Sequence, residues 1–163
     1  MARLAHMRAT VACGCLFWGF IQSAQATDLT VRGVIVVPAS CVINGGSTLS
    51  VPFGNTLLTN RVDGINYRRD VPYTVVCTGA PDKAMKLELQ GAVAAFDLRS
   101  LATNNSNLGI KMFINGAAWP LNTTVNFTYP TLPKMEAVPI RKPGSELKAG
   151  SFSASATLVV KLP

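Results

Sequence analysis

Apolar and polar residues alternate in short runs along most of this 163-residue chain, and that two-residue period limits what the chain can fold into. Successive side chains of a β-strand point to opposite faces, so alternation predicts strands with one buried face. No segment keeps a long helical period, although residues 92–101 could form one helical turn. Candidate strands lie at residues 29–37, 49–53, 71–77, 85–90, 108–114, 125–129, 135–140 and 151–162. Because turn-forming residues separate these runs, we expect an all-β sandwich, with a sheet edge or a bulge at Pro139.

The first 26 residues have the organisation of a secretory signal peptide. Arg3, His6 and Arg8 form a basic start, an apolar run covers residues 9–21, and Ala24-Gln25-Ala26 matches a small-x-small cleavage site. The apolar run is shorter than the roughly 20 residues that span a bilayer, so a transmembrane anchor is the weaker alternative. We therefore expect an exported chain whose mature form begins at Thr27.

Two cysteines remain after that cut, Cys41 and Cys77, because Cys13 and Cys15 lie in the leader. Exported chains meet an oxidising compartment, so the remaining pair most simply forms one disulfide. By the loop-entropy relation, closing this loop would contribute roughly 4 kcal/mol to stability. Two free thiols or a metal pair are the alternatives, although two cysteines without a nearby histidine make a poor zinc site.

The mature chain lacks the residues on which common catalysis and nucleic-acid binding depend. Its only histidine, His6, belongs to the leader, which excludes Ser-His-Asp and Cys-His catalysis. The acidic residues are spread singly along the chain, and it has no glycine-rich phosphate-binding motif. The formal net charge of +7 falls to +5 without Arg3 and Arg8, and the basic residues form no stripe. We expect no enzyme, cofactor, metal, nucleic-acid partner or small-molecule substrate.

Alternating strands are predicted at both ends of the mature chain. At the start, residues 27–37 present an apolar face that holds Leu29, Val31, Gly33 and Ile35. At the end, residues 151–162 present an apolar face that holds Phe152, Ala154, Ala156, Leu158, Val160 and Leu162. An immunoglobulin-like sandwich would place a further strand beside the last one, so one strand is expected to be missing there and one to be spare at the start. Addition of the first strand of one molecule to the groove of the next would solve both problems and can build a head-to-tail fibre.

With these motifs the mature chain resembles, over its whole length, a subunit of bacterial chaperone–usher pili. The resemblance rests on Leu29-Thr30-Val31-Arg32-Gly33, on Pro38-Ala39-Ser40-Cys41, on Cys77, and on the closing segment from Gly150 to Leu158. The chain departs from the family near its end, where it has Leu162 in place of the usual tyrosine. The resemblance is nearest to the minor tip-fibrillum and adaptor subunits of P-type pili.

The resemblance implies an incomplete immunoglobulin-like β-sandwich that lacks its last strand and is completed by donor-strand complementation. Residues 1–26 would be the signal peptide, residues 27–37 the N-terminal donor-strand extension, and residues 38–163 the pilin domain. Leu29, Val31, Gly33 and Ile35 would form the donor strand, and the final strand from Phe152 to Leu162 would line the acceptor groove and bind the chaperone. The implied partners are a periplasmic pilus chaperone, an outer-membrane usher and neighbouring pilin subunits. The implied location is a cell-surface pilus, reached through the periplasm.

Three interpretations compete with a minor subunit. Within the same family, a major rod pilin is the alternative, but the brief extension before Pro38 favours a minor tip or adaptor subunit. A secreted, monomeric sugar-binding β-sandwich is a second alternative, in which Trp119 and Tyr129 would stack on a sugar. In the third, both end strands pair with each other inside one self-sufficient sandwich. Polymerisation separates a pilin from a sugar-binding module, because the sugar-binding module would be a stable monomer without a donated strand.

Overall fold

The computed structural model describes residues 27, 29–35, 39–79 and 83–162. The chain divides into two units between Ile35 and Val36. Residues 29–35 form neither helix nor strand, and every strand that the structure describes belongs to the second unit. The predicted signal peptide and the predicted boundary at residues 37–38 lie outside the described residues.

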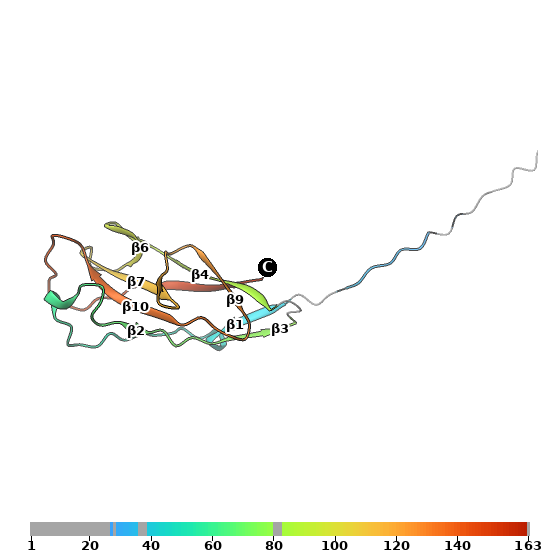
Figure 1. Ribbon diagram of the computed structural model, residues 1–163, viewed down its shortest axis with the longest axis horizontal. Coiled ribbons are helices and arrows are strands. Elements are labelled where there is room, and N and C mark those ends of the chain that lie inside the picture. The colour runs from blue at the N-terminus through green and yellow to red at the C-terminus, as the bar shows by residue number, and fades with distance from the viewer. Residues whose placement is uncertain (1–26, 28, 36–38, 80–82, 163) are drawn as a thin grey trace, which may run out of the picture. The chain divides into compact units, whose positions relative to one another are not determined.

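Eleven strands and two 3-10 turns make up the regular structure of the described residues (Figure 1). The strands are β1 (Ser40–Ile43), β2 (Arg69–Asp70), β3 (Val75–Thr78), β4 (Ala84–Gly91), β5 (Val93–Ala94), β6 (Asp97–Ala102), β7 (Leu108–Ile114), β8 (Ala117–Ala118), β9 (Thr124–Thr128), β10 (Met135–Arg141) and β11 (Ala156–Lys161). The 3-10 turns are η1 (Asn44–Gly46) and η2 (Thr59–Arg61). Across the described ranges, no helix has the length and apolar character needed to cross a membrane. The all-β class predicted from alternation is confirmed.

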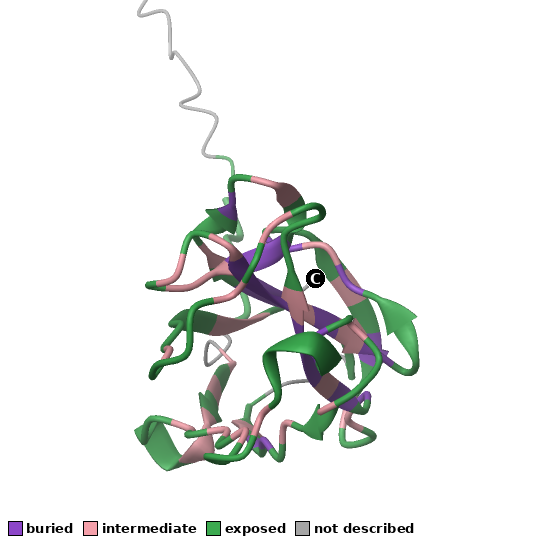
Figure 2. Cartoon of the chain, turned by 90° about the vertical axis from the view of Figure 1, so that its left-hand side faces the viewer, coloured by how far each residue is buried: buried purple, intermediate pink, exposed green. Residues whose placement is uncertain are grey.

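The strands form three antiparallel sheets. β1 pairs with β3, the largest sheet has the order β2-β10-β7-β6-β5 with β8 on β7, and the third has the order β11-β4-β9. One apolar core joins the inner faces of the two larger sheets, with Leu87 of β4 and Met112 of β7 among its buried members. Figure 2 shows buried residues along the central strands and exposed residues in the loops around them. The fold is therefore a sandwich, as predicted.

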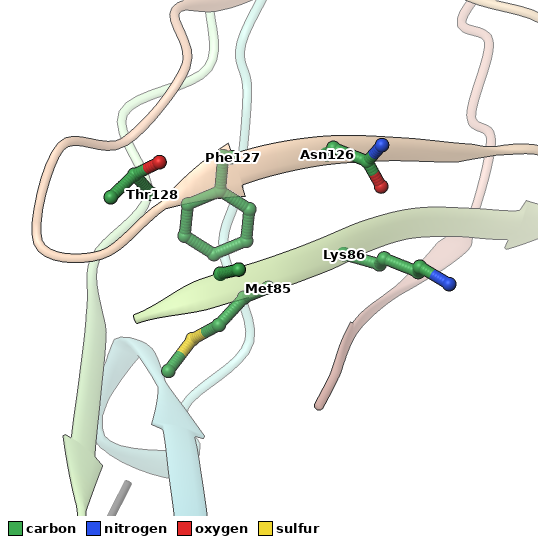
Figure 3. A pocket seen from close by; sticks show the side chains of 6 residues that line it. Met85, Lys86, Asn126, Phe127 and Thr128 are labelled. Carbon is green, nitrogen blue, oxygen red and sulfur yellow. The ribbon is translucent and has the colours of Figure 1, made fainter. Parts of the chain in front are cut away.

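The pairing of β4 with β9 shows how alternation sorts side chains between the core and solvent (Figure 3). Met85 lies opposite Phe127, and both side chains are buried in the core. Lys86 lies opposite Asn126 in the next cross-strand pair, and both are exposed. Because the side-chain period of a strand is two, this register places every second residue of both strands in the core.

Pro139 lies inside a strand that has neighbours on both sides, not at the edge or bulge that the sequence predicted. β10 pairs with β7 along its whole length, and Pro139 lies opposite Ile110 in that ladder. The carbonyl of Pro139 accepts a hydrogen bond from the Gly64 amide at 3.1 Å. The nitrogen and carbonyl of one strand residue point to the same side, so the missing N–H faces the loop at Gly64. The ladder with β7 therefore loses no hydrogen bond to the proline.

Two other expectations differ from the structure. The sequence allows one helical turn over residues 92–101, but these residues form the β5–β6 hairpin. On β6, Ser100 is fully buried whereas Leu98 is 72% exposed, so polarity does not follow burial there and the strand signal is lost. The last strand begins at Ala156, five residues later than the predicted start at Ser151.

An ion pair connects the end of β11 with β4. Glu88 of β4 is only 7% exposed although it faces away from the core, and it forms an ion pair with the Lys161 ammonium of β11. Lys86 lies directly opposite Lys161 across the same two strands. Like charges in that position repel, so the Glu88 carboxylate offsets an unfavourable pair. The hydrogen bond from Lys161 holds the pKa of Glu88 below its usual range.

We expect Glu88→Gln to lower the melting temperature most at neutral pH. Because the folded-state pKa of Glu88 is lowered, its ion pair stabilises the fold above the unfolded-state value of about 4.3. This contribution is lost as the pH falls through the lower folded-state pKa. Thermal unfolding followed by circular dichroism at several pH values between 7 and 3 measures the gap between wild type and variant, each carrying residues 27–38 after Pro163 to supply the missing strand. Glu146→Gln, at an exposed carboxylate, is the matched control, and a Glu88→Gln gap that does not shrink on acidification would contradict the assignment.

Candidate functional site

An open groove of about 740 Å³ runs between the start of β11 and the segment that follows β1. One wall consists of residues 43–53, and the other consists of residues 152–158. The floor is apolar and comes from several strands of the sandwich: Val71, Leu89, Leu101, Ile110, Met112, Met135 and Ala137. The volume lies within the range of ligand sites in proteins, roughly 300–1,000 Å³. An apolar floor between two stretches of main chain is suited to an extended apolar segment.

Both walls of the groove contain main chain that is not paired with another strand in the described residues. β11 pairs with β4 on one side, and within the described residues no strand pairs with its other side. The opposite wall beyond η1, residues 47–53, and the start of the β11 wall, residues 151–155, form no strand. Backbone groups at such an edge form a template for pairing with another strand, which proteins normally cover or block. The groove thus combines an unpaired edge with an apolar floor.

A disulfide anchors the first wall to the sandwich. Cys41 of β1 and Cys77 of β3 face each other in the β1–β3 ladder and are bonded, with their Cα atoms 4.1 Å apart. The predicted disulfide is confirmed. Just beyond it, the Asn44 side-chain oxygen accepts a hydrogen bond from the Thr74 amide at 2.8 Å. Gly45 follows with φ +59°, a left-handed conformation that glycine adopts at little cost. These contacts fix the point where the wall turns away from β1.

The residues predicted to line an acceptor groove fall into two groups. Four of them line the groove that the structure contains: Phe152, Ala154, Ala156 and Leu158. Val160 is half-buried against the core, and Leu162 is 39% exposed and follows the last residue of β11. Neither of these two is among the residues that line the groove. The small side chains of Ala154 and Ala156 leave the edge of β11 open to the groove.

Sequence reasoning did not identify the opposite wall. Leu49, Val51 and Phe53 line the groove from that side and alternate along the chain. Their alternation was interpreted as an ordinary strand of the sandwich. The period shows only that every second side chain faces apolar surroundings, and does not show whether the backbone is paired.

The segment predicted to act as a donor strand is apolar and exposed. Leu29 is 86% exposed, Val31 83% and Ile35 100%. Exposed large apolar side chains occur singly on most proteins, but a contiguous set of them marks an interaction site. Gly33 lies in the same row, and Val34 on the other face is also exposed. This segment has the composition of a strand that is completed by pairing elsewhere.

The aromatic residues proposed for sugar stacking do not form an exposed platform. Trp119 is 2% exposed within the core, and its indole N–H donates to the Thr123 carbonyl at 3.3 Å. Tyr129 packs partly buried against the same core. A smaller hollow of about 360 Å³ lies along β4 and β9 (Figure 3), and its aromatic residue, Phe127, is also buried. The prediction that Trp119 could stack on a sugar is wrong, because the core already covers its ring.

Comparisons with known proteins agree on one family. The family described as fimbrial protein matches residues 29–162. The fimbrial-like protein YfcR of Escherichia coli (strain K12) is 33% identical over 156 residues, which cover 92% of this chain and 89% of that protein. Among solved structures, the P pilus rod subunit PapA has a TM-score of 0.64 at 21% identity, covering 74% of this chain and 97% of PapA. The P pilus adaptor subunit PapF has a TM-score of 0.54 at 21% identity, covering 78% of this chain and 98% of PapF. At these identities the two structures support the fold.

Removing the disulfide should destabilise the wall that carries residues 43–53. For a loop of 36 residues, the chain-entropy relation predicts a loss of roughly 4 kcal/mol in the free energy of unfolding for Cys41→Ala/Cys77→Ala. Urea unfolding of the variant and of the oxidised chain, each carrying residues 27–38 after Pro163 so that the groove is filled, measures this difference, and the reduced chain should behave like the variant. A loss below about 1 kcal/mol would show that the disulfide does not anchor the wall.

Proposed function

The chain belongs to the fimbrial protein family, and from that premise we propose that it is a structural subunit of an adhesive surface pilus that polymerises by donor-strand exchange. In this proposal a periplasmic pilus chaperone first occupies the groove and delivers the subunit to an outer-membrane usher. The extension of a neighbouring subunit then replaces the chaperone in the groove. The subunit is thereby exported through the periplasm to the cell-surface pilus.

The observation that carries this proposal is an apolar groove with an unpaired strand edge in a chain that also has an exposed alternating segment. Leu29, Val31, Gly33 and Ile35 are proposed as the donor residues. Phe152, Ala154, Ala156, Leu158, Val160 and Leu162 are proposed as the acceptor face of the last strand. In β-strand addition the main chain provides affinity through hydrogen bonds, and alternate side chains provide specificity in the groove.

The proposed donor segment and the wall of the groove have the same length. The β11 wall of the groove extends from Phe152 to Leu158, and the donor segment extends from Leu29 to Ile35, so each has seven residues. At about 3.3 Å per residue, both span roughly 20 Å when extended. Every inward-facing donor side chain therefore has groove wall beside it.

The energy available from this insertion is large enough to hold subunits together. Burying an exposed aliphatic side chain contributes about 1.5–3 kcal/mol. Leu29, Val31 and Ile35 would together contribute roughly 5–9 kcal/mol before the costs of ordering and association are subtracted. Main-chain hydrogen bonds along the unpaired edge of β11 add to this sum.

The contact between subunits would be head-to-tail, because one molecule uses its extension and the other uses its groove. Such a heterologous contact leaves a free extension and a free groove at opposite ends of every chain of subunits. Unless the rotation between subunits closes a ring, the assembly continues as a fibre. The brief extension before Pro38 supports a minor tip or adaptor position within that fibre.

Thermal unfolding of two oxidised chains tests the proposal. One chain consists of residues 38–163, and the other carries residues 27–38 after Pro163 through a short flexible linker. We expect only the second chain to unfold as a cooperative, stable monomer, because its own extension can fill the groove. Equal stability of the two chains would contradict the proposal and would favour a self-contained secreted module.

The position in the fibre is tested separately by immunogold labelling of native pili with an antibody against this chain. A minor tip or adaptor subunit should be labelled at one end of the fibre and not along its shaft. Labelling along the whole shaft would instead assign the chain as a rod subunit. Pili from a strain without this chain are the control for the antibody.

A further inference from the structure

Two phenylalanine rings contact each other at one end of the groove. Phe53 is the last residue of the first wall to line the groove, and Phe152 is the first residue of the second wall to do so. Their ring centroids are 5.8 Å apart with an interplanar angle of 42°, which is a favourable tilted arrangement. We call this pair the aromatic clasp. It joins the two walls by side chains at the place where the groove ends.

The aromatic clasp lies at the opposite end of the groove from the disulfide. The Cys77 sulfur lies 3.7 Å from the Met85 sulfur, so the disulfide marks the start of β4. Lys161 at the end of β11 lies opposite Lys86, next to that same start of β4. Phe152 precedes the first residue of β11, which therefore places the aromatic clasp at the far end. β11 contacts β1, and Figure 1 shows the end of β11 near that strand.

Hydrogen bonds hold the main chain on both sides of the aromatic clasp. The Phe53 carbonyl accepts a hydrogen bond from the Arg69 guanidinium at 3.3 Å. Next to Phe152, the Ser153 amide donates to the Asn104 side-chain oxygen at 2.9 Å, and the Ser153 carbonyl accepts from the Asn104 amide at 3.1 Å. Both rings also pack against the apolar core. The rings are therefore held in place by the fold and do not hang free over the groove.

We propose that the aromatic clasp sets the register of the strand that fills the groove. This inference rests on the proposed function, since it concerns how the donated strand fits. The two rings occupy the place that the next inward-facing side chain of a longer strand would need. A strand with inward-facing side chains at positions 29, 31, 33 and 35 fills the groove up to the rings. Phe53 and Phe152 are thus specificity-determining residues that limit the length of the accepted segment.

The uniform apolar floor of the groove does not by itself fix the register of a donated strand. Along a groove with an apolar floor, a strand of alternating aliphatic residues could slip by two residues and still bury every second side chain. A slip of two residues toward the rings would press a side chain against them. A slip in the other direction would leave an apolar side chain outside the groove. A fixed end therefore selects one register from several that are otherwise similar.

Amide hydrogen exchange of a bound peptide measures the register directly. The oxidised chain is refolded with an excess of a ¹⁵N-labelled peptide of residues 25–39, and exchange is followed for each peptide amide. In the wild-type chain we expect exchange to slow at least tenfold along one stretch of about seven residues that ends abruptly at the aromatic clasp. In Phe53→Ala/Phe152→Ala the slowed stretch should extend by about two residues at that end, because the next inward-facing side chain can enter.

Two further variants make the outcome decisive. Leu98→Ala changes an exposed apolar side chain on β6 that does not line the groove, and it should keep the wild-type boundary. Phe152→Val removes one ring but keeps an apolar side chain, and it should also shift the boundary. This variant provides the test if the double variant does not fold. An unchanged boundary in every folded variant would overturn the register role while leaving the proposed function intact. No slowed exchange in any complex, the wild type included, would overturn the proposed function and the register role together.

Discussion

The main chain along the free side of β11 needs hydrogen-bond partners, and the rest of the structure is arranged around that need. One side of β11 is paired with β4, whereas the other borders a groove with an apolar floor. Water can satisfy the backbone there, but it leaves the apolar floor uncovered. A donated β-strand satisfies both demands at once, because its backbone pairs with the edge while alternate side chains cover the floor. The exposed segment of residues 29–35 has the composition that this requires.

The groove is held open and shaped by contacts outside it. The Cys41–Cys77 disulfide fixes the origin of one wall, and the β11–β4 ladder fixes the other. The Phe53–Phe152 contact joins the two walls at the far end. A site that is formed in advance loses less conformational entropy when it binds, so more of the burial energy remains as affinity. This arrangement is consistent with a groove whose walls are positioned by the domain and whose fold is completed by one donated strand.

Period-two alternation located the core strands of the sandwich, including β4, β7 and β9, because the apolar residues of each are more buried than the polar residues between them, apart from the ion-paired Glu88. It missed β6, where a buried Ser100 and an exposed Leu98 reverse the usual order. It also assigned Leu49 to Phe53 to an ordinary strand, since the period reports burial and not pairing. The predicted groove residues Phe152 to Leu158 line the groove, but the aromatic clasp depends on a contact between residues 99 positions apart. Contacts at such separation follow from the fold and not from local pattern.

A cross-link from the extension would show directly whether this segment fills the groove of a neighbouring subunit. A photoreactive leucine analogue at position 29 would report what that side chain touches in assembled material prepared from a mixture of ¹⁴N- and ¹⁵N-labelled chains. We expect mass spectra in which Leu29 of one chain is joined to residues that line the groove of another chain. Cross-links to surfaces outside the groove, or assembled material without any cross-link to it, would contradict the claim that the extension fills the groove of a neighbouring subunit.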